Sequence, residues 1–511
     1  MSSKVPTRSL KSQELAPALS AALRSGGRVA LVGAEDRQED GIIEIAYVLV
    51  NTPTAPLMEW TVPLERSDPQ LPSMASLDFS IGRFEREIAD QFGVTLIGHP
   101  QPARLVKHAH WPENYHPLLN DAAPSPGSLA DETDYKFLEV DSDAIYEIGV
   151  GPVHAGIIEP GHFRFSAVGE SIITMKARLW FVHRGIEKLF EGRSYPEAIV
   201  LAEKISGDTS IGHSLAMAEA VEDALGIEID PTSTLVRQLL LGMEQVYNLV
   251  NDIGAIANDV AFSIIHAFTG VQREYIMREN KRLTGHRLLR GSLRLGGGEL
   301  REQPNPDFFL DRLAAMNEII DIFTSNVMAM DRLKGTGILD TVDAKAIGCV
   351  GYVAQASGVP VAQIEAPSRF TAVDHDTPAD THSNGGQNSG KESSYAGDVA
   401  ARLDVRIEQL RATLLRLAEL SKRLGTMPAS NVGCDQSYSS LRTNGVGCVE
   451  SWRGRLTHRV ITENGRILRA KIVDPSFFNW PAVSVSLRGA MVADFPLINK
   501  SFNLSYAGND L

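Results

Sequence analysis

The sequence predicts an α+β protein: a small N-terminal α/β domain followed by a mainly α-helical bundle domain with small β-sheets. Three observations support this prediction. Short runs rich in β-branched residues fill the N-terminal part, and apolar residues at helical spacing dominate the later part. Between them, residues Asn120–Asp134 are rich in Pro, Gly, Ser and Asp, which is the composition of a linker.

The N-terminal part opens with an expected helix at Ser12–Leu23. Four runs between Gly, Pro and Asp residues predict strands, namely Arg28–Val32, Ile42–Val50, Met58–Pro63 and Ser76–Ile81. A second helix is expected at Arg83–Phe92 and ends at Gly93. Its acidic and basic residues, Glu85, Arg86, Glu87 and Asp90, are most simply a solvated helix face.

The segment Glu147–Phe165 carries two histidines, His154 and His162, among several Gly and Pro residues. Such a segment cannot be a helix interior. We expect a short β-hairpin or looped turn that brings the imidazoles close to Glu159 and Arg164.

The next segment, Leu179–His213, is expected to be helical on both sides of a break at Arg193–Pro196. Its second helix is expected to continue through Ile205.

The later part contains long apolar stretches at helical spacing. Thr232–Thr269 is broad enough in its apolar face to be the centre of a bundle, and His266 on it is expected to be a core residue rather than a ligand. Further helices are expected at Phe308–Met328 and Gly397–Leu424, and a small antiparallel sheet at Arg455–Val473.

Two segments are irregular. Leu283–Gly298 is glycine-rich, and its Arg287 and Arg294 could hold a carboxylate or a buried loop. Ser368–Ser394 is too polar to order itself, so we expect a disordered surface insertion at about 368–394 in which His375 and His382 are incidental.

Composition excludes several classes of protein. The formal net charge of −14 argues against nucleic-acid binding and against simple adhesion to anionic lipid. Three cysteines, Cys349, Cys434 and Cys448, are odd in number and far apart, so they predict neither a disulfide framework nor a zinc finger. No stretch approaches the roughly 18 apolar residues of a membrane span, so we expect that the chain does not span a membrane by itself.

Several motifs resemble one family of oxidoreductase subunits. GPVHAGIIEPGHFRF and HRGIEKLFEGR, which begin at Gly151 and His183, are similar to the large subunit of membrane-bound, complex I-related nickel–iron hydrogenases and to the 49 kDa subunit of complex I. FEREIADQFG, followed by GHP and Arg104, resembles the 30 kDa subunit of complex I. This resemblance implies a 30 kDa-like domain at 12–118, a linker at 119–139 and a 49 kDa-like domain at 140–511, a fusion typical of formate hydrogenlyase and hydrogenase-4 type large subunits.

The resemblance extends to the C-terminal part. LTGHRLLRGSLRLGGG is similar to the family's LTG-x-R and R-x-GG motifs, and Arg453, Gly454 and His458 fit its R-G-x-L-x-H motif. In nickel–iron hydrogenases the matching arginine overhangs the metal cluster. In complex I relatives an arginine of the LTG region lies near the iron–sulfur relay. The resemblance therefore places Arg287 and Arg294 near a neighbouring iron–sulfur cluster or a quinone cavity.

One departure from the family pattern decides the metal chemistry. A nickel–iron centre needs four thiolates from two C-x-x-C motifs, because soft sulfur ligands bind and bridge the metals. The first motif is replaced here by Ser206-Gly207-Asp208-Thr209, and the last twenty residues contain no cysteine. We therefore expect no bound metal.

In complex I the same cavity binds quinone through a histidine of the hairpin and a tyrosine. His154 or His162 can take the role of the quinone-binding histidine. Gly207, however, occupies the position of the tyrosine, and Gln355 occupies a position where the family commonly has arginine. Glu159 is either a proton relay, as the matching glutamate is in hydrogenases, or a structural partner of an arginine. The resemblance thus gives a candidate catalytic set, consisting of His154, Glu159, His162, Asp208, Arg453 and His458.

The resemblance implies an electron-transferring subunit of a complex I-like oxidoreductase, peripheral on the cytoplasmic side of the cell membrane. It would pass electrons from a small iron–sulfur subunit, whose clusters lie in that partner, to a quinone or similar acceptor. Membrane-arm subunits and a formate dehydrogenase-like or other electron-input subunit are the further expected partners. A non-catalytic scaffold is the alternative, and a true hydrogenase is opposed by the missing cysteines.

Overall fold

The computed structural model describes residues 4–52, 54–127, 129, 137, 144–156, 158–360, 395–426 and 441–511. The insertion predicted at about 368–394, with His375 and His382, lies outside the described residues, as does Cys434.

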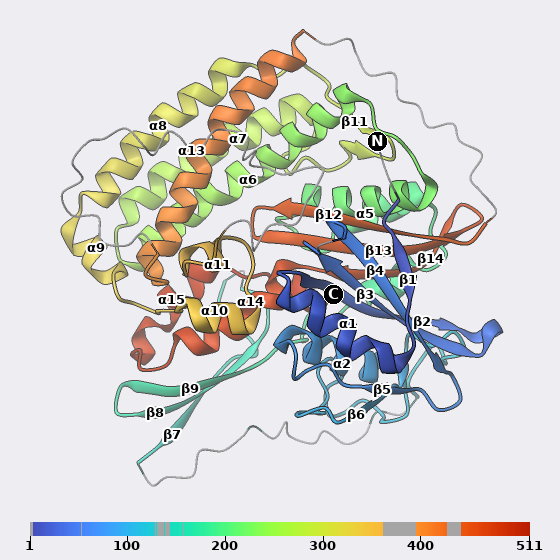
Figure 1. The fold of residues 1–511 in the computed structure, drawn as a ribbon. Helices are drawn as coiled ribbons and strands as arrows, with labels where there is room; N and C mark the ends of the chain where they lie inside the picture. The colour runs from blue at the N-terminus through green and yellow to red at the C-terminus, as the bar shows by residue number, and fades with distance from the viewer. Residues whose placement is uncertain are drawn as a thin grey trace.

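The N-terminal part folds around a four-stranded sheet of order β1-β4-β3-β2, drawn in blue in Figure 1. β3 pairs antiparallel with β2 and β4, and β1 pairs parallel with β4. A second sheet joins β5 and β6. The elements are β1 Thr7–Ser9, α1 Ser12–Arg24, β2 Arg28–Arg37, η1 Gln38–Asp40, β3 Ile42–Val50, β4 Leu57–Glu65, β5 Gln70–Pro72, α2 Phe79–Phe92 and β6 Thr95–Ile97.

Two predictions for this part are wrong. The run Ser76–Ile81 is not a strand, because Asp78 caps helix α2 by accepting a hydrogen bond from Ser80 N at 2.8 Å. The charged face of α2 is not solvated either, since Glu85 and Asp90 are buried. Asp90 instead accepts three backbone N–H bonds, from Leu105, Val106 and Lys107. Helix α2 does end at Gly93, in the left-handed conformation, as predicted.

The centre of the second part is α6, as predicted from its apolar stripe. It packs against α5, α7, α13 and α15 (Figure 1). The predicted stretch Thr232–Thr269 is divided into two helices at Ala261, whose φ is +62°. His266 follows this break and is exposed, so its prediction as a core residue is wrong. The helices of this region are α5 Ser210–Leu225, α6 Pro231–Asp259, α7 Ser263–Thr284, α8 Pro306–Thr324, α9 Val327–Leu333, α10 Thr341–Ile347, α11 Gly351–Ala356 and α13 Val399–Leu424.

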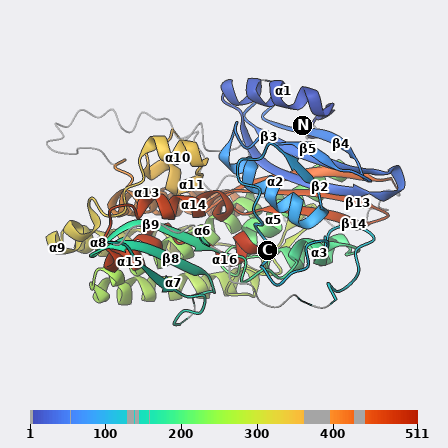
Figure 2. The ribbon, with the colours of Figure 1, turned by 90° about the horizontal axis from the view of Figure 1, so that it is seen from below.

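The predicted C-terminal sheet is confirmed as an antiparallel sheet of order β12-β13-β14. Helix α5 lies on β12 so closely that a side chain at Gly447 would collide with the backbone of Ala216. On β14, Lys471 packs against Gly33 of β2, so the N-terminal domain lies beside this sheet (Figure 2). The elements are β12 Thr443–Ser451, β13 Gly454–Glu463, β14 Arg466–Val473, α14 Pro475–Ser486, η3 Val492–Asp494, α15 Phe495–Phe502 and α16 Tyr506–Asp510.

The histidine segment forms the predicted hairpin, with strands β7 (Tyr146–Val150) and β8 (His162–Val168) paired antiparallel. A third strand, β9 (Ser171–Arg178), completes the sheet, which extends from the lower edge of the molecule in Figure 1.

The helices expected after this hairpin are shorter than predicted. Residues 179–185 are irregular, with Trp180 at φ +66°, and the helices here are α3 (Ile186–Phe190) and α4 (Tyr195–Ala202), so Ile205 lies beyond α4. The glycine-rich segment carries two short strands, β10 (Leu293–Arg294) and β11 (Gly297–Gly298).

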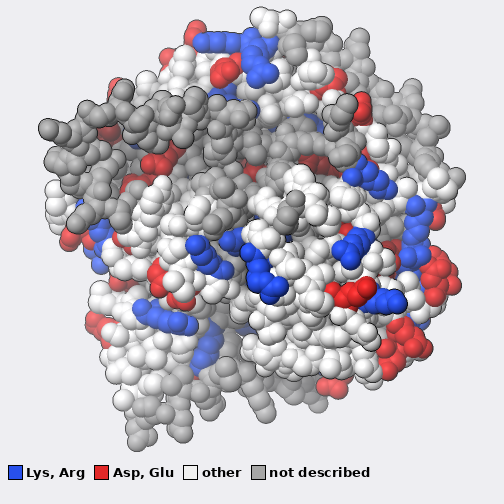
Figure 3. Space-filling view, viewed as in Figure 1, with Lys and Arg blue, Asp and Glu red and all other residues white. Residues whose placement is uncertain are grey.

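The surface carries both signs of charge. Basic and acidic side chains are interspersed over the face in Figure 3 rather than collected into one extended basic patch. Within the described residues, no helix has the length and apolar character needed to cross a bilayer.

Candidate functional site

The loop between α4 and α5 holds the carboxylate of Asp208 against the guanidinium of Arg453. Arg453 Nη1 donates to Asp208 Oδ1 at 2.9 Å, and Nη2 donates to Oδ2 at 2.6 Å, which is the two-pronged geometry of a strong arginine–carboxylate pair. Arg453 Nε donates to Asn503 O at 2.7 Å, and the guanidinium lies 3.9 Å from the Trp452 ring. Two residues of the predicted catalytic set therefore come together, with the Asp208 side chain 38% exposed and that of Arg453 4% exposed.

Side chains of helix α6 hold the loop between α4 and α5 in place through hydrogen bonds. Tyr247 Oη and Asn248 Nδ2 both donate to the carbonyl oxygen of Asp208, at 3.0 and 2.8 Å. Glu244, fully buried, accepts from the backbone N–H groups of Ile211 and Gly212 in the first turn of α5. Tyr247 thus places a phenol beside the loop, although its hydroxyl group already donates to the backbone carbonyl of Asp208.

The pKa values of Asp208 and Glu244 are shifted in opposite directions, by charge and by burial. Burial raises the pKa of Asp208, but the Arg453 charge and the hydrogen bonds from Arg453, Ser206 and Thr209 outweigh it and bring the pKa to about 2. Burial raises the pKa of Glu244 to about 8, because its two backbone hydrogen bonds compensate only in part. Asp208 is therefore a fixed anion near neutral pH, whereas Glu244 can carry a proton.

The C-terminal segment completes the same site. Ser206 Oγ and Ser505 Oγ lie 2.8 Å apart, and Ser206 also donates to Asp208 Oδ1 at 2.9 Å. Trp452 Nε1 donates to Thr209 Oγ1 at 3.1 Å. The two segments in which the family carries its cysteines thus meet, through hydroxyls. Sequence reasoning missed Ser505, because it searched the end of the chain only for cysteine.

The hairpin lies against this C-terminal segment. Glu159 accepts a hydrogen bond from Ala507 N at 3.0 Å, and a side chain at Gly161 would stand 2.7 Å from the Tyr506 ring. Arg164 forms an ion pair with Glu147 at 3.4 Å, and the described residues show no ion pair between Arg164 and Glu159.

Both hairpin histidines hold the hairpin's own backbone. His154 Nε2 donates to Gly161 O at 2.7 Å, and His162 Nδ1 donates to Gly151 O at 3.1 Å. Each ring keeps one further nitrogen, and His162 Nε2 is buried without a hydrogen-bond partner among the described residues. A histidine with one nitrogen anchored and the other open can donate a hydrogen bond to a bound carbonyl oxygen when the ring is protonated, and can accept one from a hydroxyl group when the ring is neutral.

His458 belongs to a buried series of ionisable groups. His458 Nε2 lies 3.1 Å from His213 Nδ1, and His213 Nε2 lies 3.1 Å from Asp474 Oδ2. Burial, followed by the neighbouring His213, lowers the pKa of His458 well below its usual value, so the ring is neutral. Neither His213 nor Asp474 was singled out from the sequence, although His213 lies one helical turn beyond Thr209.

The ion pairs of Arg287 and Arg294 do not involve the residues around Asp208 and Arg453. Arg287 pairs with Glu274 at 2.6 Å, and Arg294 pairs with Glu299. Both are about half exposed, at 44% and 50%. Their predicted place near an iron–sulfur cluster or quinone cavity stays a prediction. Arg290, between them, lies closer to the site, since its Nε donates to Ser210 Oγ at 3.3 Å.

The two described cysteines do not take part in the site. Cys349 and Cys448 are buried and unpaired, and burial raises the pKa of each thiol to about 12. No group of three or more His, Cys, Asp or Glu side chains is arranged to hold a metal ion within the described part of the chain.

A cavity lies between the N-terminal domain and the second part. Its outer section, about 290 Å³, is lined by His108, His110, Trp111 and Phe181 among others. It shares Gln91, Val106, Pro117, Trp180 and His183 with an inner section of about 50 Å³. We call these the outer and inner cavities.

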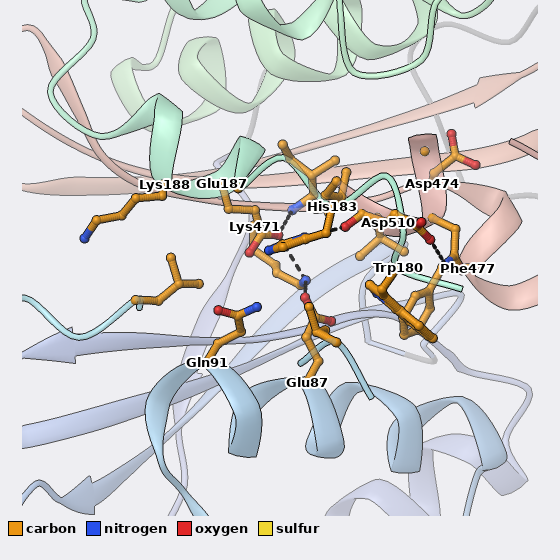
Figure 4. A pocket seen from close by; sticks show the side chains of 18 of the residues that line it. Glu87, Gln91, Trp180, His183, Glu187, Lys188, Lys471, Asp474, Phe477 and Asp510 are labelled. Carbon is orange, nitrogen blue, oxygen red and sulfur yellow. Dashed lines mark hydrogen bonds and ion pairs between the residues drawn. The ribbon is translucent and has the colours of Figure 1, made fainter. Parts of the chain in front are cut away.

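Figure 4 shows the inner cavity, where charges from both parts of the chain meet. Lys471 of β14 bonds to Glu87 of α2 at 2.5 Å and to Glu187 of α3 at 3.0 Å. His183 Nδ1 donates to the Asp510 carbonyl at 2.7 Å, and Asp474 is another of the residues that line this cavity. Because a buried ion cluster costs desolvation free energy unless it is paired, this arrangement fixes the N-terminal domain against the second part.

Profiles of known protein families match both parts of the chain. The profile of "Respiratory-chain NADH dehydrogenase, 30 Kd subunit" matches residues 9–126, and that of "Respiratory-chain NADH dehydrogenase, 49 Kd subunit" matches residues 259–442. The "Nickel-dependent hydrogenase" profile matches residues 184–251. These matches confirm the predicted resemblance and the order of its two parts.

Individual relatives extend over most of the chain. The sequence is 30% identical over 500 residues to formate hydrogenlyase subunit 5 of Escherichia coli, covering 94% of this chain and 84% of that protein. It is 31% identical over 442 residues to hydrogenase-4 component G of the same organism, covering 83% and 73%. A chain from the structure of the membrane-bound sulfane sulfur reductase (MBS), an archaeal respiratory membrane complex, shares the fold with a TM-score of 0.60 at 21% identity, covering 73% of this chain and 100% of that chain.

Proposed function

Because the chain belongs to the oxidoreductase family in which complex I-type 30 kDa and 49 kDa regions are fused, we propose that it is an electron-transferring subunit of a membrane-associated complex I-like assembly. It passes electrons from a neighbouring iron–sulfur subunit to a quinone or similar acceptor. Its partners are that subunit, the membrane arm and an electron-input subunit, at the cytoplasmic side of the membrane. The relatives named for formate hydrogenlyase, hydrogenase-4 and a respiratory membrane complex support this setting.

The donor set at Asp208 and Arg453 does not fit a nickel–iron centre. At the family's first cysteine motif this chain has the hydroxyls of Ser206 and Thr209, and Ser505, in the segment expected to hold the second motif, contacts Ser206. A hydroxyl oxygen is a hard ligand and cannot replace a bridging thiolate. A guanidinium also sits directly on the Asp208 carboxylate, which uses both oxygens in that pair. We therefore propose chemistry at this site that does not use nickel.

One observation gives the main support for an organic electron acceptor. The two motif segments meet at Asp208, Arg453 and Ser505, and Glu159 of the hairpin bonds to Ala507, two residues beyond Ser505. Hydrogen-bond donors and acceptors therefore lie where the resemblance places the family's reaction. Arg453 stays protonated, because the Asp208 charge keeps its pKa raised despite burial. A fixed cation beside hydroxyls stabilises the negative charge that develops on a quinone oxygen as it accepts electrons.

The test is quinone reduction by the intact complex purified from membranes. His154→Gln and His162→Gln are compared with the control His116→Gln, because His116 also bonds through Nδ1 to a backbone carbonyl, Asp90 O at 3.1 Å, but lies in the N-terminal domain. We expect a fall of about 100-fold in one hairpin variant, as for the loss of a general acid. Equal rates in all three variants of a fully assembled complex would leave the hairpin without a catalytic role.

A scaffold function is the second candidate, and the surface of α7 favours it. Four apolar side chains on this helix are exposed by between 42% and 52%, namely Ile264, Phe268, Val271 and Tyr275. Their spacing places them on one face of the helix. A stripe of this kind is suited to contact with a partner subunit. Wild-type complex that assembles but reduces no quinone would support this candidate instead.

A further inference from the structure

Two polar side chains at the junction of the outer and inner cavities have unused hydrogen-bonding atoms. Gln91 of α2 lines both cavities and is 5% exposed, yet its amide group has no hydrogen-bond partner among the described residues. In Figure 4 this amide points away from α2 into the inner cavity. His183 also lines both cavities, and its Nε2 atom has no partner in the described part of the chain. A buried amide costs free energy while its donor and acceptor stay unsatisfied, so a molecule held in the cavity is needed to satisfy it.

The free nitrogen of His183 is a hydrogen-bond acceptor. Its Nδ1 atom lies 2.7 Å from the carbonyl oxygen of Asp510, and a carbonyl oxygen only accepts, so the ring proton is on Nδ1. Burial lowers the pKa of His183, which keeps the ring neutral and leaves a lone pair on Nε2. Gln91 and His183 therefore offer an amide NH₂ group and two acceptor atoms to a bound molecule.

Aromatic rings line the outer cavity. Trp111 comes from the N-terminal domain, and Trp180 and Phe181 come from the segment before α3. Phe181 is 39% exposed, so the cavity is open to solvent on its side. The Trp180 ring lies 5.8 Å from the guanidinium groups of both Arg83 and Arg178, and its φ of +66° is unfavourable for so bulky a residue. Backbone strain of this kind is concentrated at functional sites, and flat apolar walls suit a planar ring.

The loop that carries Trp111 is held in place by the protein alone. Asp90 accepts hydrogen bonds from the backbone of residues 105–107. Arg178 donates to two carbonyl oxygens of the same stretch, at 2.5 and 3.1 Å. Lys107 Nζ donates to two carbonyl oxygens later in the loop, at 3.1 and 3.2 Å. A cavity whose wall is ordered in advance binds a ligand at a lower entropy cost.

The size and charge of the outer cavity favour a small neutral ligand. Its volume is about 290 Å³, near the lower end of the roughly 300–1,000 Å³ of small-molecule sites. No Asp or Glu is among the described residues that line it, so a cation would find no counter-charge there. The ammonium group of Lys107 is already bonded to carbonyl oxygens of the loop. A neutral molecule of one or two rings therefore fits best.

We propose that the cavity between the domains binds a neutral nitrogen heterocycle with a lactam or carboxamide edge, its ring against Trp111 and its edge at Gln91 and His183. Such an edge presents an N–H group beside a carbonyl oxygen, and the Gln91 amide bonds to both at once. His183 Nε2 accepts from a further N–H group of the ligand. The ring occupies the outer cavity, because the inner cavity of about 50 Å³ holds only about three water molecules.

This binding site is separate from the site proposed for electron transfer. Asp208, Arg453 and Ser505 are not among the described residues that line either cavity. The proposal does not depend on the proposed function, and its test needs no electron transfer.

The main test is titration calorimetry on the full chain with two matched pairs of probes. Hypoxanthine and nicotinamide carry the paired N–H and C=O groups, whereas purine and 3-acetylpyridine lack the pair. We expect hypoxanthine and nicotinamide to bind with dissociation constants below about 1 mM. Purine and 3-acetylpyridine should bind about 10- to 100-fold more weakly, because a two-point hydrogen bond discriminates at this level. Saturable binding of neither hypoxanthine nor nicotinamide, or equal binding within both pairs, would overturn the proposal.

Gln91→Met separates recognition of the ligand from a structural role. Because the amide has no partner in the described protein, the melting temperature of this variant should not fall. Hypoxanthine should bind about 10- to 100-fold more weakly to it, while the affinity for purine changes by less than about twofold. Gln70→Met is the control, since Gln70 is exposed and bonds to Asp68 at 2.7 Å, and it should leave both affinities unchanged. Unchanged affinity for hypoxanthine in Gln91→Met, or failure of that variant to fold, would show that the proposal is wrong.

Two further measurements locate the bound ring. Trp111→Leu should weaken hypoxanthine and purine alike, by about tenfold, because it removes the contact with the ring that both share. In hydrogen–deuterium exchange, saturating hypoxanthine should slow the amides of residues 105–117 and 179–185 in the wild type but not in Gln91→Met. Slower exchange only in other parts of the chain would place the ligand elsewhere and overturn the proposal.

Discussion

Replacing Asp208 by Asn removes one charge of the pair that organises the site. The side chain of Arg453 is 4% exposed, so in the variant its guanidinium would remain buried without a counter-charge. The pKa of Asp208 falls from 3.8 to about 2 in the folded chain, because Arg453 and three hydrogen-bond donors outweigh the effect of burial. That shift corresponds to at most about 2.4 kcal/mol. Since the Asp208 side chain is 38% exposed, solvent screening reduces the expected loss to about 1–2 kcal/mol.

The pH dependence has a definite sign. A carboxyl whose folded pKa is depressed contributes its full stability above the unfolded pKa of 3.8, and that contribution is lost as pH falls toward about 2. Wild type and Asp208→Asn should therefore differ at pH 7 and converge as the pH falls below about 4.

Urea unfolding of the chain measures this difference, with a double-mutant cycle that includes Arg453→Met. We expect a coupling free energy of about 1–2 kcal/mol between the two positions. The ion pair of the exposed Asp121 with the half-buried Arg66, at 2.7 Å, is the control, and there Asp121→Asn should cost less than about 0.5 kcal/mol. A coupling no larger than that of the control would refute the view that this ion pair organises the site.

Three further predictions concern other parts of the fold. Burial raises the pKa of Glu244 to about 8, above its unfolded value of 4.5, so the free energy of unfolding should fall as the pH rises from about 4.5 to about 8 and level off above that, and Glu244→Gln should reduce this slope in urea unfolding. Gly447→Ala should destabilise the chain by more than about 3 kcal/mol, because the added methyl group would meet the Ala216 backbone of α5; a melting temperature equal to wild type would contradict this. Phe268→Asp on α7 should leave the melting temperature of the isolated chain within a few degrees of wild type but lower the yield of assembled complex, measured by co-purification; full yield would exclude this stripe as a docking surface.

Patterns that depend on local sequence predicted the fold well. The apolar stripe of α6, the antiparallel β12-β13-β14 sheet and the Gly93 stop of α2 follow from periodicity and backbone preference, which neighbouring residues determine. The helix predicted over residues 179–185 is absent for the opposite reason, because distant contacts determine this segment. Their apolar side chains pack against segments distant in sequence, and the backbone follows those contacts rather than a helix, as when Val182 N bonds to Asp510.

The candidate site was predicted only in part, because its partners are far apart in sequence. Asp208 and Arg453 were named separately, yet their pairing joins positions separated by 245 residues. Ser505, His213 and Asp474 were missed because each is an ordinary residue until the fold brings it to its partner. The charged face of α2 was misread for the same reason, since the Lys471 that pairs with Glu87 lies 384 residues away.

The most direct test of the central proposal follows the iron–sulfur clusters of the partner subunit after quinone is added to the reduced, intact complex. Stopped-flow absorbance should show rapid cluster reoxidation and stoichiometric quinol in wild type. In Asp208→Asn both should slow together while the complex stays assembled. Clusters that remain reduced in wild type, with quinone present in excess, would contradict electron transfer to quinone by this subunit.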